Sequence, residues 1–345
     1  MSDVMTRVDG PGLGPDLKTR LARWETITVF LLLCSILYGA TTADGFLSGQ
    51  NLNSICSDVA EVALIALPLT LIIIAAEIDL SVASILGLTS ALLGYLWNHN
   101  WPMEMIVPFV LVIGGVLGAV NGFLITRLGL PSLAVTIGTL GMYRGLAFVI
   151  LGDQAVTDYP QRFLDWGQGT FAGTEIPNPT VLFAVLAVII GITLHRTGVG
   201  RAIFAIGANE EAARFAGLRV KRVKFWLFVV SGVISALAGI IYSFRFGSSR
   251  GDNGTGLELS VVACVLLGGV SIFGGRGHLL GVIAAVFLLG TLRNALTLNN
   301  VSSDALTIVT GGLLLLSVLG PSVAARVREA LRRSHSPTPT PSTSL

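Results

Sequence analysis

The chain alternates long apolar runs with short polar stretches along most of its length. Most runs are long enough to cross the ~30 Å hydrocarbon core of a bilayer as helices that rise about 1.5 Å per residue. The pattern therefore predicts an all-α, polytopic membrane protein with about ten transmembrane helices. The runs at 80–97 and 257–274 contain Gly and Ser and are the most open to being re-entrant or broken. All the predicted spans fall at about 26–43, 55–76, 80–97, 105–126, 131–151, 180–195, 223–244, 257–274, 278–298 and 304–320.

The composition agrees with the membrane prediction. Hydrophobic residues make up 52% of the chain and charged residues only 12%, whereas about a quarter of the residues of a soluble domain are charged. A net charge of +2 gives no reason to expect a nucleic-acid partner. Cys34, Cys56 and Cys264 have no metal-binding spacing, so no metal site is predicted.

The sequence predicts no catalytic residue and no cofactor. The lysines are Lys18, Lys221 and Lys224, and none follows a glycine. The phosphate-binding loop G-x-x-x-x-G-K-[ST] is therefore impossible. If ATP drives this protein, another chain must bind and hydrolyse it.

The basic residues sort by predicted membrane side. With ten alternating spans, 17 of the 22 Lys and Arg residues lie on one side and 3 on the other, and Arg144 and Arg293 lie within spans. Because cytoplasmic loops carry the excess of Lys and Arg, this split predicts that both termini are cytoplasmic. It also predicts that loop 152–179 lies outside and loop 196–222 inside. The expected domains are an N-terminal tail (1–25), a transmembrane domain (26–320) and a basic, disordered C-terminal tail (321–345).

The one long basic segment between the tails runs from His195 to Lys224. Its residues Ile203, Ile206 and Ala213 recur at helical spacing, which predicts a short amphipathic helix over 200–217. Two interpretations are open. The helix lies in a groove of a soluble partner, or it rests on the membrane surface with its basic side chains held by anionic lipid.

The amino-acid sequence of this segment resembles the sequences of a known protein family. Gly200-Arg201, Ala205-x-Gly207-x-Asn209-Glu210, Ala212-Ala213 and Gly217-Leu218-x-Val220 are similar to the coupling segment of permease subunits of sugar-importing ABC transporters of the ribose, rhamnose and autoinducer-2 group. The resemblance extends over 46–55, 72–88, 121–145 and 266–285. It implies that the segment docks into an ATPase subunit through Gly200, Arg201, Gly207, Asn209, Glu210, Glu211, Ala213 and Gly217.

The same resemblance implies the rest of the transport system. We expect an extracytoplasmic sugar-binding protein and a second permease subunit, identical or not, in the bacterial cytoplasmic membrane, with membrane lipid around them. The E-I-D-L-S-V run favours a small neutral sugar or sugar-like substrate, although Ala76-Glu77 stands where the family more often has a glycine pair. A permease for branched-chain amino acids or nucleosides is an alternative.

An ATP-independent secondary carrier or channel is a further alternative. It would need carboxylates or histidines near the middle of the membrane. All four histidines, His99, His195, His278 and His335, lie at loops or at the ends of predicted spans. The sequence therefore favours the ATP-driven importer.

Two similar tetrapeptides suggest an internal repeat. Asp79-Leu80-Ser81-Val82 and Glu258-Leu259-Ser260-Val261 each open an apolar segment. They predict two inverted halves, at about 55–151 and 223–320, with a pathway between them. The two carboxylates either cap their helices or contact substrate. The candidate pathway or gating residues are Asp79, Ser81, Asn121, Arg144, Glu258 and Ser260.

Arg144 and two glycines carry the most specific expectations. A charge within a span is costly, so Arg144 is predicted to pair with Asp58 or Glu61, in a structural ion pair or in a substrate site. Glycine is costly in a helix. Gly207 and Gly217 are therefore expected either to allow close approach to the ATPase or to end or bend an interfacial helix.

Overall fold

The computed structural model describes residues 24–302 and, beyond them, residues 305, 308, 311, 312 and 315. Residues 1–23 of the predicted N-terminal tail, the whole C-terminal tail (321–345) and most of the last predicted span, 304–320, lie outside the described residues, whereas residues 24 and 25 already belong to the first helix. Within 24–302 every regular element is a helix, as predicted. The helices are α2 (Trp24–Thr42), α3 (Gly49–Asp58), α4 (Ala60–Ile74), α5 (Val82–Asn98), α6 (Met103–Thr126), α7 (Ser132–Leu151), α8 (Gln161–Gln168), η1 (Phe171–Gly173), α9 (Asn178–Arg196), α10 (Gly198–Ala208), α11 (Glu210–Phe215), α12 (Val220–Phe246), α13 (Leu257–Leu267) and α14 (Leu279–Leu298).

Helices lie at the first nine predicted span positions, but several are interrupted. Five described helices, α6, α7, α9, α12 and α14, are long and apolar enough to cross a membrane. The pair α3 and α4, bent by 43°, would make a sixth. The run 257–274, which was open to being re-entrant or broken, is broken, because α13 ends at Leu267. The break near 80–97 lies just before α5, in residues 75–81.

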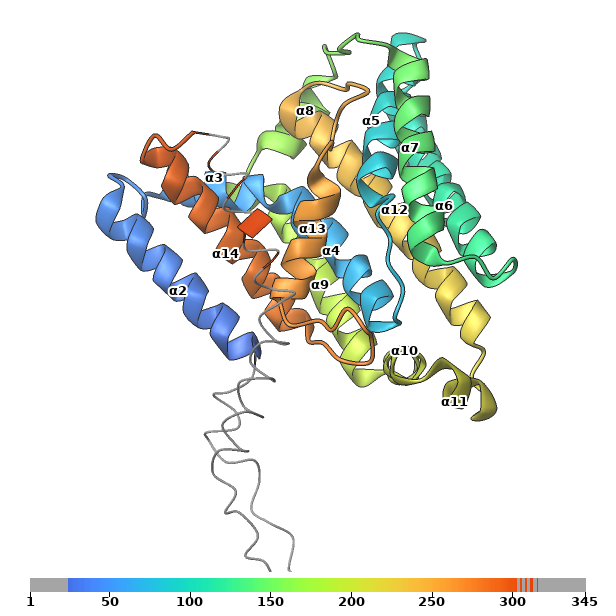
Figure 1. Cartoon of the computed structure of the whole chain (residues 1–345). Coiled ribbons are helices and arrows are strands. Elements are labelled where there is room, and N and C mark those ends of the chain that lie inside the picture. Colours follow the sequence, from blue (N-terminus) through green and yellow to red (C-terminus); the bar gives the residue numbers. More distant parts are fainter. Residues whose placement is uncertain (1–23, 303–304, 306–307, 309–310, 313–314, 316–345) are drawn as a thin grey trace, which may run out of the picture.

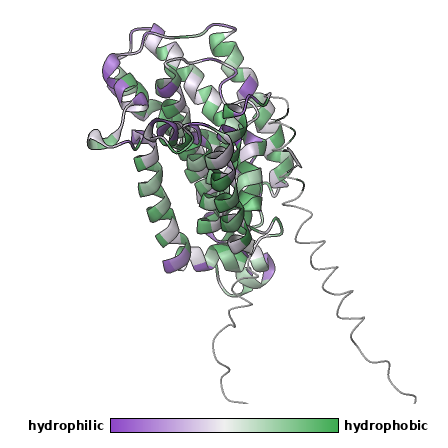
Figure 2. Ribbon diagram, turned by 90° about the vertical axis from the view of Figure 1, so that its left-hand side faces the viewer, coloured by the Kyte–Doolittle hydropathy of each residue, from purple (hydrophilic) through white to green (hydrophobic). Residues whose placement is uncertain are grey.

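Helix α4 lies at the centre of the bundle. It buries 14 of its 15 residues, because it is apolar on all sides and therefore has no face suited to water. Helix α12 packs against α4, α5 and α6 and crosses the molecule diagonally (Figure 1). Helices α2 and α14 pack together on one side, and α5, α6 and α7 stand on the other. Hydrophilic residues gather mainly at the helix ends and connections (Figure 2).

A row of glycines brings α6 and α12 into backbone contact. Gly114, Gly118 and Gly122 recur every four residues on α6 and face Phe225, Phe228 and Gly232 of α12. A Cβ atom on Gly118 would overlap the carbonyl oxygen of Phe228, and one on Gly232 would overlap that of Gly114. Small residues at this spacing allow two membrane helices to approach closely and gain van der Waals contact.

The two ends of the bundle carry different connections (Figure 1). Helix α8, within the predicted outer loop 152–179, lies at one end, and α10 and α11 lie at the opposite end. The single helix predicted over 200–217 is two helices. Asn209 separates them because its backbone is extended (φ −162°), and its side-chain oxygen accepts a hydrogen bond from the Ala212 amide, which starts α11.

Candidate functional site

The C-terminal end of α10 meets two non-helical segments of this chain. One segment, 75–81, joins α4 to α5, and the other, 268–278, joins α13 to α14. The Gly275 amide donates to the Ile74 carbonyl (2.8 Å), and a Cβ atom on Gly207 would overlap that same carbonyl oxygen. We call this contact of Gly207 with Ile74 and Gly275 the junction. Gly207 therefore permits close approach to its own chain, and the expectation that it makes room for an ATPase is corrected.

A buried lysine links α11 to the same region. Lys224 Nζ lies 2.5 Å from a Glu77 oxygen and 2.5 Å from a Glu210 oxygen. The side chains of Lys224 and Glu77 are only 9% and 13% exposed. The hydrogen bond from Lys224, with help from Arg214, holds the pKa of Glu210 below its ordinary value. Glu210 is the first residue of α11, and Glu77 lies in the 75–81 segment, so one ammonium group ties the two together.

The predicted ATPase-coupling residues do not form one surface. Gly200, Gly207 and Ala213 are buried within this chain, and Glu210 is half-buried. Ala213, 4% exposed, packs with Ile206 and Val220. The members that remain exposed are Arg201, Asn209, Glu211 and Gly217.

Gly217 ends α11, as one of the two interpretations expected. Its φ is +83°, a left-handed conformation that favours glycine. The Leu218 amide donates to Ala213 (3.1 Å) and the Gly217 amide to Arg214 (3.0 Å), which satisfies the last carbonyls of the helix.

Phe215 is a surface residue that sequence reasoning missed. It is 86% exposed at the tip of α11, next to the exposed Glu211 and Ala212. Its signal was present in the sequence, since Phe215 is the only aromatic residue between Ile206 and Lys224. Aromatic residues are enriched at protein–protein interfaces, which makes Phe215 a candidate contact for a partner.

Three candidate pathway residues come together in a buried polar cluster. Asp79 accepts hydrogen bonds from the Ser81 amide (3.0 Å), the Ser81 hydroxyl (2.6 Å) and the Ser231 hydroxyl (3.0 Å). Asn121 donates to the Ser81 hydroxyl (2.8 Å). All four side chains are fully or almost fully buried. The bond to the Ser81 amide, just before α5 begins, supports the local structural role of Asp79. Ser231 was not predicted.

A polar cavity of about 450 Å³ contains another candidate, Ser260. Arg245, at the end of α12, reaches both Glu61 and Asp58 (each 2.9 Å) beside it. We call this space the outer cavity, because α12 runs here from α11 toward the end of the bundle that carries α8 (Figure 1). Further polar groups come from Tyr242, Arg293, Asn294 and Thr297.

The predicted partner of Arg144 was wrong. Asp58 and Glu61 pair with Arg245, because α12 packs against α4, which carries Glu61 and follows Asp58, whereas α7 packs mainly against α5 and α6. The Arg144 guanidinium instead donates to the carbonyl oxygens of Gly251 (3.0 Å), Asn253 (2.6 Å) and Ala83 (3.3 Å). Arg144 thus fastens the 247–256 loop to α5.

Glu258 makes no capping hydrogen bond to α13, so the capping interpretation does not hold for this residue. It lies in the first turn of α13, where the helix dipole favours a carboxylate. Within the described residues, no group of three or more His, Cys, Asp or Glu side chains is arranged to hold a metal ion.

The bundle combines helices long enough to cross a membrane with interrupted helices and a polar cavity. This architecture is typical of membrane transport proteins. The chain belongs to the family described as "Branched-chain amino acid transport system / permease component", whose model matches residues 51–318. The resemblance to transporter permeases drawn from the sequence is confirmed, and the chain is a multi-pass membrane protein.

Curated relatives match over nearly their whole length. The autoinducer 2 import system permease protein LsrD of Photorhabdus luminescens is 32% identical over 319 residues, which cover 90% of this chain and 95% of the relative. LsrD of Yersinia enterocolitica is 33% identical over 308 residues, covering 87% and 92%. No solved structure matches the chain.

Proposed function

We propose that this chain is the permease subunit of an ATP-driven, binding-protein-dependent importer in the bacterial cytoplasmic membrane. It carries a small neutral sugar-like compound of the autoinducer-2, ribose or rhamnose type. ATP hydrolysis takes place on a separate ATPase subunit, a second permease subunit completes the pathway, and both termini lie in the cytoplasm. The relatives named for autoinducer 2 import support the substrate class.

The junction is the observation that carries the proposal. Gly207 of α10 touches Ile74, the last residue of α4 before the 75–81 segment, and Gly275 in the 268–278 segment. Lys224 ties α11 to Glu77 within the 75–81 segment. A displacement of α10 and α11 by an ATPase would therefore move residues 75–81 and 268–278 directly. These segments lead directly into α5 and α14. Movement of α5 and α14 against the rest of the bundle would open or close a pathway.

The outer cavity supports a neutral substrate. Its guanidinium, carboxylate, amide and phenol groups can donate hydrogen bonds to sugar hydroxyls and accept hydrogen bonds from them. Arg245 and Arg293 together balance the charges of Asp58 and Glu61, so the cavity does not need a charged ligand for balance. A volume of about 450 Å³ falls in the range of small-molecule pockets.

Branched-chain amino acids remain a second candidate substrate, because the matching family model is described by them. A zwitterion would need a separate partner for each of its charges. In the outer cavity the carboxylates are engaged by Arg245, whereas Arg293 forms no ion pair within the described residues. This leaves the sugar-like substrate as the better supported of the two.

The proposal is tested by transport in proteoliposomes. The tagged chain is purified from its native membranes, and the chains that co-purify are identified and reconstituted with it. We expect an ATPase among them, and ATP-dependent uptake of labelled autoinducer 2, ribose or rhamnose but not of leucine or uridine. Uptake driven by a proton or sodium gradient without ATP would make the protein a secondary carrier. Leucine or uridine uptake would select the alternative substrate class.

Docking of the ATPase is tested separately at Phe215. The Phe215→Ala variant should lower ATPase co-purification at least about fivefold, because it removes an exposed aromatic anchor of the kind that dominates protein interfaces. Phe171→Ala is the matched control, since Phe171 is also exposed (52%) but lies in η1, within the predicted outer loop. Equal ATPase recovery from both variants would exclude the α11 tip as the docking site.

A further inference from the structure

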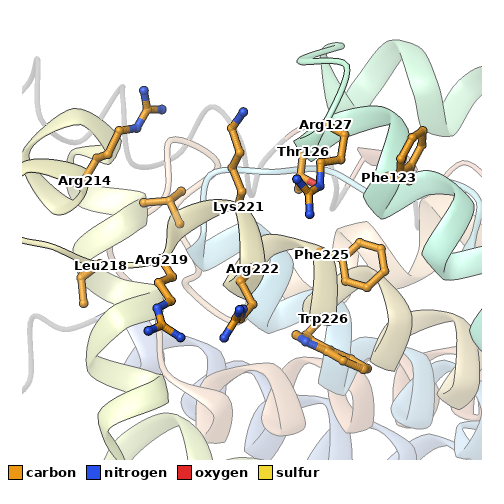
Figure 3. A pocket seen from close by; sticks show the side chains of 11 residues that line it. Phe123, Thr126, Arg127, Arg214, Leu218, Arg219, Lys221, Arg222, Phe225 and Trp226 are labelled. Carbon is orange, nitrogen blue, oxygen red and sulfur yellow. The ribbon is translucent and has the colours of Figure 1, made fainter.

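A second, larger pocket lies where α12 begins. Its volume is about 980 Å³, and it is bordered by the last residues of α6, the turn after α11 and the first two turns of α12. Figure 3 shows this pocket from close by. We call it the basic pocket because five cations line it and no carboxylate does. They are Arg127, Arg214, Arg219, Lys221 and Arg222.

Four of these cations have no counterion in the part of the chain that the structure describes. Arg214 is paired with Glu210 (2.9 Å), but no ion pair or side-chain hydrogen bond is formed by Arg127, Arg219, Lys221 or Arg222 among the described residues. Like charges gathered at one place repel each other. An anion bound among them would relieve that repulsion, and guanidinium groups suit the paired oxygens of a phosphate.

Two aromatic residues of the basic pocket face outward. Trp226 is 56% exposed and Phe123 is 51% exposed. Arg219 is the residue before α12, and Arg222 and Trp226 lie one turn apart on the helix, so the three form one stripe at the start of α12. Figure 3 shows Arg219 and Arg222 with their cationic ends pointing the same way, beside Trp226. The stripe therefore changes from cationic to aromatic along the helix axis.

The apolar surface continues away from the basic pocket. Val230 on α12 and Val116 and Val120 on α6 are exposed, and both helices are long and apolar enough to cross the membrane. A surface of this composition on two membrane-length helices is suited to contact with lipid, and the cations lie at its border. Aromatic residues beside a basic cluster at such a border are typical of the membrane interface, and basic pockets between membrane helices bind phospholipid head groups.

We propose that the basic pocket binds an anionic glycerophospholipid. Its phosphate lies among Arg219, Arg222 and the neighbouring cations, and its acyl chains lie along Trp226 and the α6–α12 surface. Free phosphate would use the cations but not the aromatic and aliphatic border. An ATPase would be expected at the exposed tip of α11, whereas Trp226 and Phe123 belong to membrane-spanning helices.

The bound lipid would also contact the network that holds α11. Arg214 of the pocket bonds Glu210, and Glu210 bonds Lys224. The negative charge of a phosphate bound at Arg219 and Arg222 would weaken the attraction between Arg214 and Glu210. We therefore expect the lipid to influence how tightly α11 is held against the junction. This consequence does not depend on which substrate is carried.

The experiment measures lipid binding on the purified full-length chain in detergent. Native mass spectrometry is recorded after addition of palmitoyl-oleoyl phosphatidylglycerol, of the matching phosphatidylcholine, or of inorganic phosphate. We expect phosphatidylglycerol to stay bound and phosphatidylcholine to dissociate. The double variant Arg219→Gln/Arg222→Gln should lower the bound phosphatidylglycerol at least about fivefold. All four arginines of the test and control variants are exposed, so folding should survive.

The matched control is Arg196→Gln/Arg276→Gln. It removes the same charge from the same end of the bundle but outside the pocket, and it should bind phosphatidylglycerol like the unmodified chain. A second measurement uses brominated phosphatidylglycerol, which quenches nearby tryptophans. Quenching should fall clearly in Trp226→Phe, because that tryptophan lies beside the proposed acyl chains.

Several results would overturn the proposal. Equal loss of lipid in the control variant would mean general electrostatic attraction. Displacement of phosphatidylglycerol by millimolar inorganic phosphate would indicate a free-phosphate site. Unchanged lipid binding in Arg219→Gln/Arg222→Gln would show that these arginines do not bind the lipid. Protection of the same arginines by a co-purified ATPase would show that the pocket is covered by protein and not by lipid.

Discussion

At the scale of single residues, the protein depends on charges that are satisfied inside the bundle. Lys224 joins two carboxylates, Arg245 joins two others, and Arg144 donates only to carbonyl oxygens. A charge at membrane depth is costly unless it has such partners. Each of these side chains also connects elements far apart in the sequence. Replacing any of these side chains should therefore lower the stability of the protein more than it changes the transported substrate.

Replacing Lys224 should destabilise the protein. Lys224→Met leaves Glu77 almost buried without its cation, which we expect to cost about 3 kcal/mol and to lower the melting temperature in detergent. Lys221→Met is the control, because Lys221 is exposed and forms no ion pair within the described residues. The double variant Lys224→Met/Glu77→Gln should regain part of the loss. If Lys224→Met melted like Lys221→Met, the bridge would not contribute to stability.

Arg144→Ala should reduce the amount of folded protein without changing substrate preference. The change leaves three carbonyl oxygens without their donor, and we expect a loss of about 3 kcal/mol. Membrane abundance and melting temperature measure the effect, with Arg162→Ala, whose side chain is 84% exposed, as the control. Normal abundance together with an altered substrate preference would instead put Arg144 in the pathway.

At the scale of elements, the bundle combines interrupted helices with helix pairs whose backbones pack closely. The α6–α12 pair relies on glycines that face the partner backbone, whereas the α10–α11 pair relies on a break at Asn209. The α6–α12 arrangement places backbone against backbone, so a side chain cannot be added there without moving a helix. The junction is built in the same way, since Gly207 meets the carbonyl of Ile74. These contacts give the interrupted segments defined positions.

Gly118→Leu should separate α6 from α12. Its side chain would meet the carbonyl oxygen of Phe228, and overpacking of this kind costs about 1–3 kcal/mol. The melting temperature should fall. Gly138→Leu, on α7, is the matched control because a side chain there meets no atom within 4 Å. Equal melting of the two variants would argue against the tight α6–α12 contact.

At the scale of the whole molecule, the opposite ends of the bundle carry different surfaces. One end has α8 and the long loop around it, and the other has α10, α11 and the basic pocket. The excess of Lys and Arg at the second end is the reason to assign it to the cytoplasm. The predicted inverted repeat and domain boundaries remain predictions.

Cysteine labelling tests this orientation. In a chain whose three native cysteines are replaced by serine, Ala155→Cys should react with a membrane-impermeant maleimide in intact cells. Ala212→Cys should react only after permeabilisation. Both alanines are exposed. Ala155 precedes α8 and Ala212 belongs to α11, and these two helices lie at opposite ends of the bundle. Labelling of Ala212→Cys in intact cells would reverse the proposed sidedness.

The sequence by itself determined the class of the protein and the position of its helices. Apolar length and charge content are local properties, so helices were predicted at the right places, and the motifs at 200–220 were sufficient to indicate the permease family. A break in the run at 257–274 was also open from the sequence, because Gly and Ser occur within that apolar run. The terminal glycine of α11 could be expected because a left-handed residue at a helix end is itself a local requirement.

Only the tertiary structure decided which distant groups meet. Lys224 and Glu77 are 147 residues apart in the sequence, and Arg245 and Glu61 are 184 apart. Helical spacing gives the face of a residue but not the helix that faces it, which is why Arg144 was paired with the wrong carboxylates. For the same reason Gly207 was expected to approach a partner protein. Its closest neighbour is the chain's own interrupted backbone, which only the packing of α4, α10 and the 268–278 segment could bring there.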